Sequence, residues 1–319
     1  MNKPYSFARG RSKQVKQSRF DVASFIDIGE RPYQQDTILA DFPNGEDIGI
    51  GVLADGMGGH LGGEVASNRA LSAAFAEIKV QMVRYRAGQI TIPDALRLAV
   101  DRANAAVAGD VASLPELTGM GTTLVICVVA GPQLYWASVG DSPLYLFRDG
   151  TLQQLNADHS MGPQIDAMVV SGIIDAAEAA THPQRNQLLS AVCGSDIAQI
   201  DCPETPFLMA AGDILLLASD GIQTLTDDAI SRVIRKKRRL HSDEIAHELM
   251  QAVIDAENPA QDNASLILLK LENDAAVLQP LPQATPAPDR PQGGHQPQCT
   301  IDNPQLEQAS DLLNKALSL

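Results

Sequence analysis

Five aspartates stand beside turn residues at the ends of short apolar segments, where carboxylates could bind a ligand. They are Asp36, Asp55, Asp141, Asp220 and Asp262. Each one alone is most simply a turn or capping residue, because aspartate is common in turns. Five such residues in one domain are harder to explain in this way. Oxygen ligands without histidine or cysteine favour hard cations, so the pattern predicts a site for Mg²⁺ or Mn²⁺.

Seven short segments rich in Val, Ile and Leu are expected to be the β-strands that carry these aspartates. They are residues 22–28, 48–54, 122–129, 134–139, 144–147, 214–218 and 264–271. The connection Ala130-Gly131-Pro132-Gln133 is typical of a hairpin, which indicates largely antiparallel sheets. Apolar periodicity predicts helices over residues 64–86, 93–112 and 242–256. Strands in runs, with helices set between them, favour an α+β layered fold.

Each of the five aspartates is expected at a strand end. Asp55, Asp141 and Asp220 follow the strands that finish at residues 54, 139 and 218. Asp36 is expected just after the first strand, and Asp262 lies just before the last one. Glycines beside several of these carboxylates would let backbone carbonyls approach a cation as well.

The composition is that of a globular protein with an excess of acidic residues. Of 319 residues, 45% are hydrophobic and 20% are charged, and the formal net charge is −15. This charge disfavours nucleic acid as a partner, because phosphates would be repelled. No apolar run approaches the roughly 18 residues needed to span a bilayer, and the N-terminus lacks the apolar core of a secretory signal. We therefore expect a cytoplasmic chain that does not bind membranes.

The chain divides into four parts by composition. Residues 1–18 are basic and are expected to be disordered, and residues 19–272 hold all the expected strands. Residues 273–303 have the composition of a linker, since seven prolines fall between Pro280 and Pro304. Residues 304–319 are expected to form an amphipathic helix. That helix either folds back on the domain or binds a partner, and the sequence does not choose between these options.

Seven motifs, taken in order, resemble those of the PPM family of metal-dependent Ser/Thr protein phosphatases, also called type 2C, in its bacterial form. The motifs are Arg31 with Gln35-Asp36, Asp55-Gly56-Met57-Gly58-Gly59-His60, Gly119-Met120-Gly121-Thr122-Thr123, Gly140-Asp141-Ser142, Asp158-His159-Ser160, Ser219-Asp220-Gly221 and Asp262-Asn263. No single motif is specific, whereas seven in the family's order are. The resemblance covers roughly residues 20–272.

The resemblance implies a four-layer αββα sandwich, with two antiparallel sheets inside and the metal ions at one end between them. The ligands that it implies for two Mn²⁺ or Mg²⁺ ions are Asp55 as the bridge, the Gly56 carbonyl, Asp220 and Asp262 on the second ion, and Asp36 through water. Arg31 occupies the position of the family's phosphate-binding arginine, and Asp141 with Asp220 matches the position of a third ion. Residues from about 161 to 181 correspond to a flap that shapes substrate choice.

The resemblance implies hydrolysis of phosphoserine and phosphothreonine by metal-activated water, with Arg31, Asp36 and Asp55 in the catalytic set. Two divalent cations about 4 Å apart can turn a bridging water into hydroxide, and an arginine can bind two phosphate oxygens at once. The implied partners are proteins that a Ser/Thr kinase has phosphorylated. A catalytically weak phosphoprotein-binding relative is one alternative, although a binder has no need of all five carboxylates. A structural Mg²⁺ or Ca²⁺ protein is another, but it leaves Arg31 unexplained.

Overall fold

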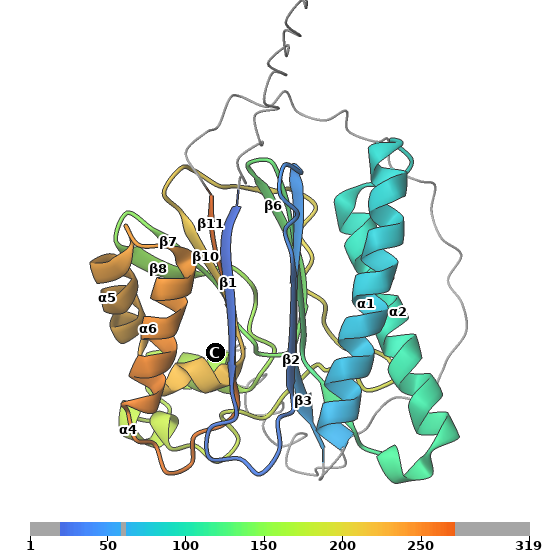
Figure 1. Ribbon diagram of the computed structural model, residues 1–319. Coiled ribbons are helices and arrows are strands. Elements are labelled where there is room, and N and C mark those ends of the chain that lie inside the picture. The colour runs from blue at the N-terminus through green and yellow to red at the C-terminus, as the bar shows by residue number, and fades with distance from the viewer. Residues whose placement is uncertain (1–19, 59–61, 272–319) are drawn as a thin grey trace, which may run out of the picture.

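Two β-sheets lie face to face at the centre of the molecule, with helices on both outer surfaces (Figure 1). The computed structural model describes residues 20–58 and 62–271. One sheet has the strand order β1 (Phe20–Asp27), β11 (Ala264–Leu271), β10 (Ile214–Ala218), β7 (Leu144–Arg148) and β8 (Thr151–Gln154). The other has the order β2 (Asp36–Asp41), β3 (Ile48–Met57), β5 (Leu124–Ala130), β6 (Gln133–Val139) and β9 (Phe207–Leu208), with β4 (Gly121–Thr122) paired to β3. All of these strand pairs are antiparallel.

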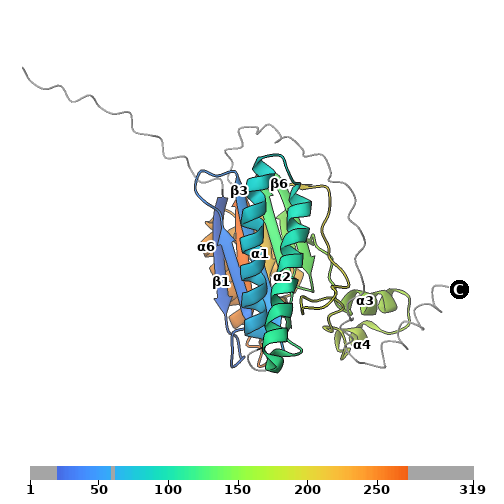
Figure 2. The same cartoon turned by 90° about the vertical axis from the view of Figure 1, so that its right-hand side faces the viewer.

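Helices cover the outer face of each sheet. Within the described residues, α1 (Gly62–Arg86) and α2 (Ile92–Ser113) pack on the sheet that contains β3, and α5 (Asp227–Lys237) and α6 (Ser242–Ile254) cover the other sheet. Two short helices, α3 (Gly162–Val170) and α4 (Ala176–Ala180), project to one side (Figure 2), and the 3₁₀ helices η1 (Pro115–Leu117) and η2 (Asp220–Thr224) complete the set. The arrangement confirms the expected αββα sandwich. None of the helices in the described ranges combines the length and apolar character needed to cross a membrane.

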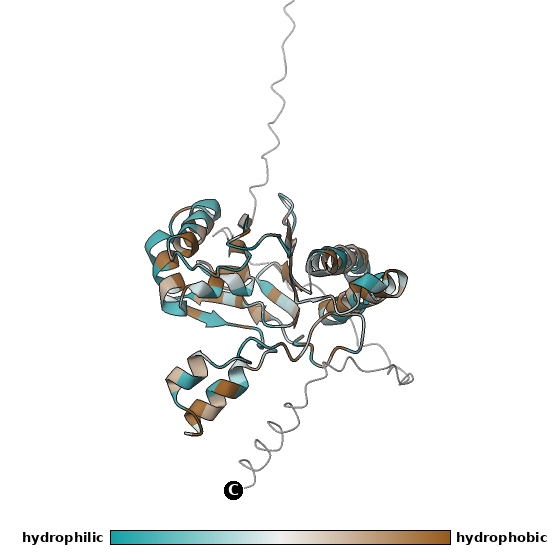
Figure 3. Cartoon of the chain, turned by 90° about the horizontal axis from the view of Figure 1, so that it is seen from below, coloured by the Kyte–Doolittle hydropathy of each residue, from teal (hydrophilic) through white to brown (hydrophobic). Residues whose placement is uncertain are grey.

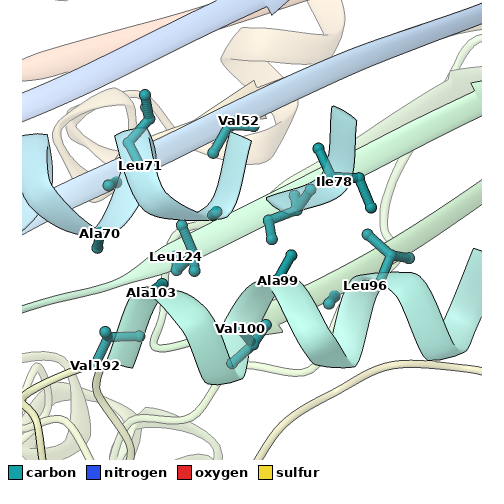
Figure 4. Close-up of a cluster of buried hydrophobic side chains, with 14 of the residues drawn as sticks. Val52, Ala70, Leu71, Ile78, Leu96, Ala99, Val100, Ala103, Leu124 and Val192 are labelled. Atoms are coloured by element: carbon teal, nitrogen blue, oxygen red, sulfur yellow. The ribbon is translucent and has the colours of Figure 1, made fainter. Parts of the chain in front are cut away.

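Small side chains let α1 and α2 pack closely on their sheet. Ala70 of α1 and Ala99 of α2 are fully buried, and Figure 4 shows them near Val52 of β3 and Leu124 of β5. Between the sheets, a second layer of buried apolar side chains includes Val125, Cys127, Leu215, Leu217, Ile267 and Leu269. In the view from below, α5 and α6 carry hydrophilic residues on much of their surface (Figure 3). Burial on both faces of each sheet fixes the strand ends relative to one another.

Most of the expected elements are confirmed, with bounds that differ by a few residues. The sequence did not predict β2, because only a short apolar stretch separates its terminal residues Asp36 and Asp41. It also did not predict α5, which begins with two aspartates and ends with three basic residues, so its apolar face is narrow. Asp36 lies at a strand end as expected, but that end is the start of β2 and not the end of the first strand. Asp55 lies inside β3 rather than after it, because pairing with β4 extends β3 to Met57.

Three predicted segments lie outside the described residues. They are the basic segment 1–18, the Pro-rich segment 273–303 and the expected helix 304–319. The expected flap, residues 161–181, is described and contains α3 and α4. It has a small apolar core of its own, made by Met161, Ile165 and Ala179.

Candidate metal centre and active site

The five aspartates singled out by the sequence meet at one end of the sandwich, near the end of β3. Asp36 of β2 lies directly opposite Asp55 of β3 in the antiparallel register. Asp220 begins η2 just after β10, and Asp262 lies just before β11, the neighbour of β10. Asp141 follows β6. Each sheet thus contributes carboxylates to the same region.

Two threonines fix the backbone at Asp55. The Thr122 hydroxyl donates to the carbonyl oxygen of Asp55 at 2.8 Å, and the Asp55 N–H donates to the Thr123 hydroxyl at 3.0 Å. The Thr123 hydroxyl also lies 2.7 Å from the hydroxyl of Ser142, the residue after Asp141. The Gly-Thr-Thr motif therefore acts as a structural support that links the Asp55 strand to the Asp141 turn.

The turn that carries Asp141 depends on a glycine and a buried histidine. Gly140 has φ = 101°, a left-handed conformation that side chains rarely adopt. Its N–H donates to Nδ1 of His159, which is 4% exposed, at 3.2 Å. Burial lowers the pKa of His159, which keeps the ring neutral and able to accept this hydrogen bond. His159 thus supports the turn.

Burial and mutual repulsion raise the pKa values of the clustered carboxyl groups. For Asp55 the pKa rises well above its usual value, because of burial first and then of the charges of the other four aspartates. Burial, followed by the charge of Asp220, raises the pKa of Asp141 to about 7. Burial, followed by the charge of Asp262, raises the pKa of Asp220 to about 6. Without cations, these carboxylates are costly to keep ionised together.

The chemical type of the donor groups suits divalent cations. Asp36 is 4% exposed, and its Oδ2 accepts a hydrogen bond from Ser219 at 2.7 Å. Its buried Oδ1 has no hydrogen-bond partner among the described residues. An unsatisfied carboxylate oxygen next to other carboxylates is expensive unless positive charge sits between them. Oxygen-only ligands suit Mg²⁺ or Mn²⁺.

One carboxylate of the cluster is already engaged by an arginine. Nη2 of Arg31 lies 2.6 Å from Oδ2 of Asp262, and both side chains are about half exposed. In the part of the chain that the structure describes, no three acidic, histidine or cysteine side chains are spaced as ligands of one ion. A cation bound between Asp220 and Asp262 would compete with Arg31 for the Asp262 carboxylate.

A cavity of about 730 Å³ opens beside the cluster. Arg31, Asp141, Asp220 and Asp262 form part of its wall. Further wall residues come from β7, from the flap segment and the loops on either side of it, and from the start of α5, and they include Tyr145, Asp158, Asp166, Arg185 and Asp227. Two hydrogen bonds of 2.7 and 3.0 Å join Arg185 to Asp166, so both basic residues on the wall are paired with acidic ones.

The Asp158 segment was identified in the sequence only through the family motifs, and the sequence did not single out Tyr145 or Asp227. Asp227 follows Thr226, which caps α5 through its hydroxyl, so the pair gives only the signal of an ordinary helix start. Tyr145 lies inside a buried strand and gives the signal of a core residue. Their place in the cavity depends on contacts between distant segments, which a local pattern does not report.

Several known proteins are similar to this chain in sequence and in structure. The protein phosphatase 2C family matches residues 29–267. The serine/threonine phosphatase stp of Listeria welshimeri is 35% identical over 201 residues, which cover 62% of this chain and 76% of that protein. The crystal structure of the Mycobacterium tuberculosis phosphatase PstP/Ppp has a TM-score of 0.64 and 31% identity, over 80% of this chain and 99% of that one.

The catalytic domain of PstP in complex with two manganese ions also matches, with a TM-score of 0.64 and 28% identity over 80% of this chain and 99% of that one. The family match covers the strands that carry the five aspartates, and it extends over more than half of the chain. This chain therefore belongs to the protein phosphatase 2C family of metal-dependent phosphatases.

Proposed function

We propose that this chain removes phosphate from phosphoserine and phosphothreonine residues of proteins, and that it does so with two Mn²⁺ or Mg²⁺ ions. The main support for the proposal is that four other aspartate carboxylates lie close to Asp55, and that Arg31 lies on the wall of the adjoining cavity. Family membership and the manganese-bound PstP relative support it.

We assign the metal-binding roles to the residues that match the family motifs. Asp55 would hold both ions, Gly56 would contribute its carbonyl, Asp220 and Asp262 would complete the second site, Asp36 would act through water, and Asp141 with Asp220 would hold a third ion. Gly56 tolerates no side chain, because a Cβ there would collide with the Gly63 carbonyl. Bound cations would supply the positive charge that activates water and offsets the charge of the phosphoryl oxygens.

The chain's own groups bind and orient the substrate. Arg31 is about half exposed on the cavity wall, so its guanidinium can present two parallel N–H donors to phosphoryl oxygens. Asp36 offers a buried oxygen, without a hydrogen-bond partner among the described residues, that can accept a proton from water. The flap segment and the start of α5 form the walls along which the peptide on either side of the phosphorylated residue would lie.

Partners and location stay predictions from the sequence. The expected substrates are proteins phosphorylated by a Ser/Thr kinase, and residues 304–319 are a candidate segment for binding a further partner. A cytoplasmic location and the absence of nucleic-acid or membrane binding also stay predictions.

The test is hydrolysis of p-nitrophenyl phosphate and of a phosphothreonine peptide, with Mn²⁺ and with excess chelator. Activity should require the metal, and Asp55→Asn should lower turnover by roughly 100-fold or more. Asp228→Asn is the matched control, since this exposed aspartate of α5 does not line the cavity. Full activity in chelator would contradict the metal requirement. Tight binding of the phosphopeptide without phosphate release, at saturating Mn²⁺, would identify a catalytically weak relative instead.

A further inference from the structure

Two buried amide side chains flank Asp262, and they bind different parts of the site. Gln261 is 6% exposed and Asn263 is 4% exposed. A buried amide is costly unless its donors and acceptor are satisfied, so its partners indicate what it holds in place. The side chain of Asn263 makes its hydrogen bonds to the loop between β1 and β2. They are Nδ2 to the Ile28 carbonyl at 2.8 Å, Nδ2 to the Tyr33 carbonyl at 3.1 Å, and the Gln35 N–H to Oδ1 at 2.8 Å.

These three hydrogen bonds reach the loop on both sides of Arg31. Ile28 precedes Arg31 by three residues, and Tyr33 and Gln35 follow it by two and four. The Arg31 side chain is about half exposed and forms an ion pair with Asp262. An exposed ion pair holds a side chain only weakly. The position of the guanidinium therefore depends mainly on the conformation of the loop.

The loop also lies directly against the backbone of residues 261–263. The Glu30 N–H donates to the Gln261 carbonyl at 2.9 Å. Gly29 has φ = 59°, and a Cβ at this position would collide with the carbonyl oxygen of Asp262. The segment that carries a candidate metal ligand and the loop that carries Arg31 thus form one packed unit, with the Asn263 amide between them.

We propose that Asn263 is a positioning residue for Arg31, which holds the β1–β2 loop so that the guanidinium reaches the phosphoryl group. This proposal rests on the phosphate-binding role assigned to Arg31 above. Without the amide, the carbonyls of Ile28 and Tyr33 lose a buried donor, and the loop gains freedom. A small displacement of an orienting group is enough to weaken substrate binding strongly.

Gln261 offers a matched comparison on the other side of Asp262. Its Nε2 donates to the carbonyls of Gly221 and Asp262, each at 3.0 Å, and its Oε1 accepts from the Thr224 hydroxyl at 2.7 Å. The side chain therefore holds η2, the helix that begins with Asp220, instead of the Arg31 loop. Gln261→Ala and Asn263→Ala remove similarly buried amides from the two neighbours of the same aspartate.

The experiment is a double-mutant cycle of Asn263→Ala with Arg31→Ala, measured on p-nitrophenyl phosphate at saturating Mn²⁺. We expect each single variant to raise KM by roughly tenfold, with a smaller loss of kcat. The double variant should have the KM of Arg31→Ala alone, because Asn263 acts through Arg31. Gln261→Ala should leave KM near the wild-type value. Calorimetric Mn²⁺ binding to the metal-free variants should be unchanged, within about twofold, for Asn263→Ala.

Each contrary result overturns a defined part of the argument. If the KM increases multiply in the double variant, or if Asn263→Ala weakens Mn²⁺ binding without raising KM, Asn263 does not act through Arg31. An unchanged KM for Arg31→Ala removes the role assigned to Arg31 and, with it, the one proposed for Asn263. Should Asn263→Ala fail to fold in a thermal melt, Asn263→Ser supplies the test. Its hydroxyl can still donate to one carbonyl, so KM should rise by less than for Arg31→Ala, and an unchanged KM would refute the proposal.

Discussion

Removal of divalent cations should make the protein less stable as the pH rises from about 5 to about 8. The structure raises the pKa of Asp141 to about 7 and that of Asp220 to about 6, mainly through burial. In the unfolded chain both groups ionise near pH 4. The folded protein therefore binds protons that the unfolded chain has released. This contribution to stability is complete below the unfolded pKa, and it is lost as the pH rises through the folded values.

The size of the effect follows from these two pKa values. Between about pH 5 and pH 8, Asp141 alone would lose about 3 kcal/mol of stabilisation, and Asp220 alone would lose about 1 kcal/mol. The two losses do not simply add, since the charge of Asp220 is one cause of the shift at Asp141. The contribution of His159 to stability increases with pH, because its lowered pKa favours the folded state at higher pH. It therefore offsets part of the loss from the two aspartates. A net loss of about 3 kcal/mol is a large part of the stability of a typical domain.

The assay is urea unfolding of the chelator-treated protein at several pH values, followed by the fluorescence of its single tryptophan, Trp136, which is 7% exposed. Asp141→Asn should flatten the pH dependence, because the amide does not titrate. Added Mn²⁺ should reverse the trend, since cation binding favours the deprotonated carboxylates and strengthens with pH. A metal-free stability that stays constant or increases from pH 5 to pH 8, identical in Asp141→Asn, would refute the reasoning.

Three further outcomes are expected. Asp141→Asn should raise the Mn²⁺ concentration for half activity while leaving KM near wild type, and a normal titration curve would remove the third ion from the proposal. Truncation after Glu272 should leave turnover of p-nitrophenyl phosphate close to that of the full chain, since no candidate site residue follows it; an inactive or insoluble product would show that the tail belongs to the core. Leu124→Ala, at a fully buried position, should lower the unfolding free energy by about 2–5 kcal/mol in urea melts, and a loss below about 1 kcal/mol would contradict the packing described.

The local sequence pattern was sufficient to predict the strands that have a strong apolar signal. The strands β5, β10 and β11 were expected because their cores are nearly continuous runs of Val, Ile and Leu. β2 was missed because its apolar stretch is too short to stand out between aspartates. α5 was missed because most of its residues are charged or polar, and its burial rests on Ile230 and Ile234. Weak patterns of this kind become structure only when a neighbouring sheet covers them.

The sequence alone determined the composition of the site, namely five aspartates, one arginine and the turn residues around them, in the order typical of the protein phosphatase 2C family. Only the tertiary structure decided how these residues act on one another. Strand pairing sets Asp36 opposite Asp55, and the contact between Arg31 and Asp262 joins residues 231 positions apart. The raised pKa values of the aspartates and the hydrogen bonds of Asn263 also arise from contacts between segments that are distant in the sequence. Electrostatic repulsion, desolvation and hydrogen bonding depend on distance and burial in space, which spacing along the chain does not specify.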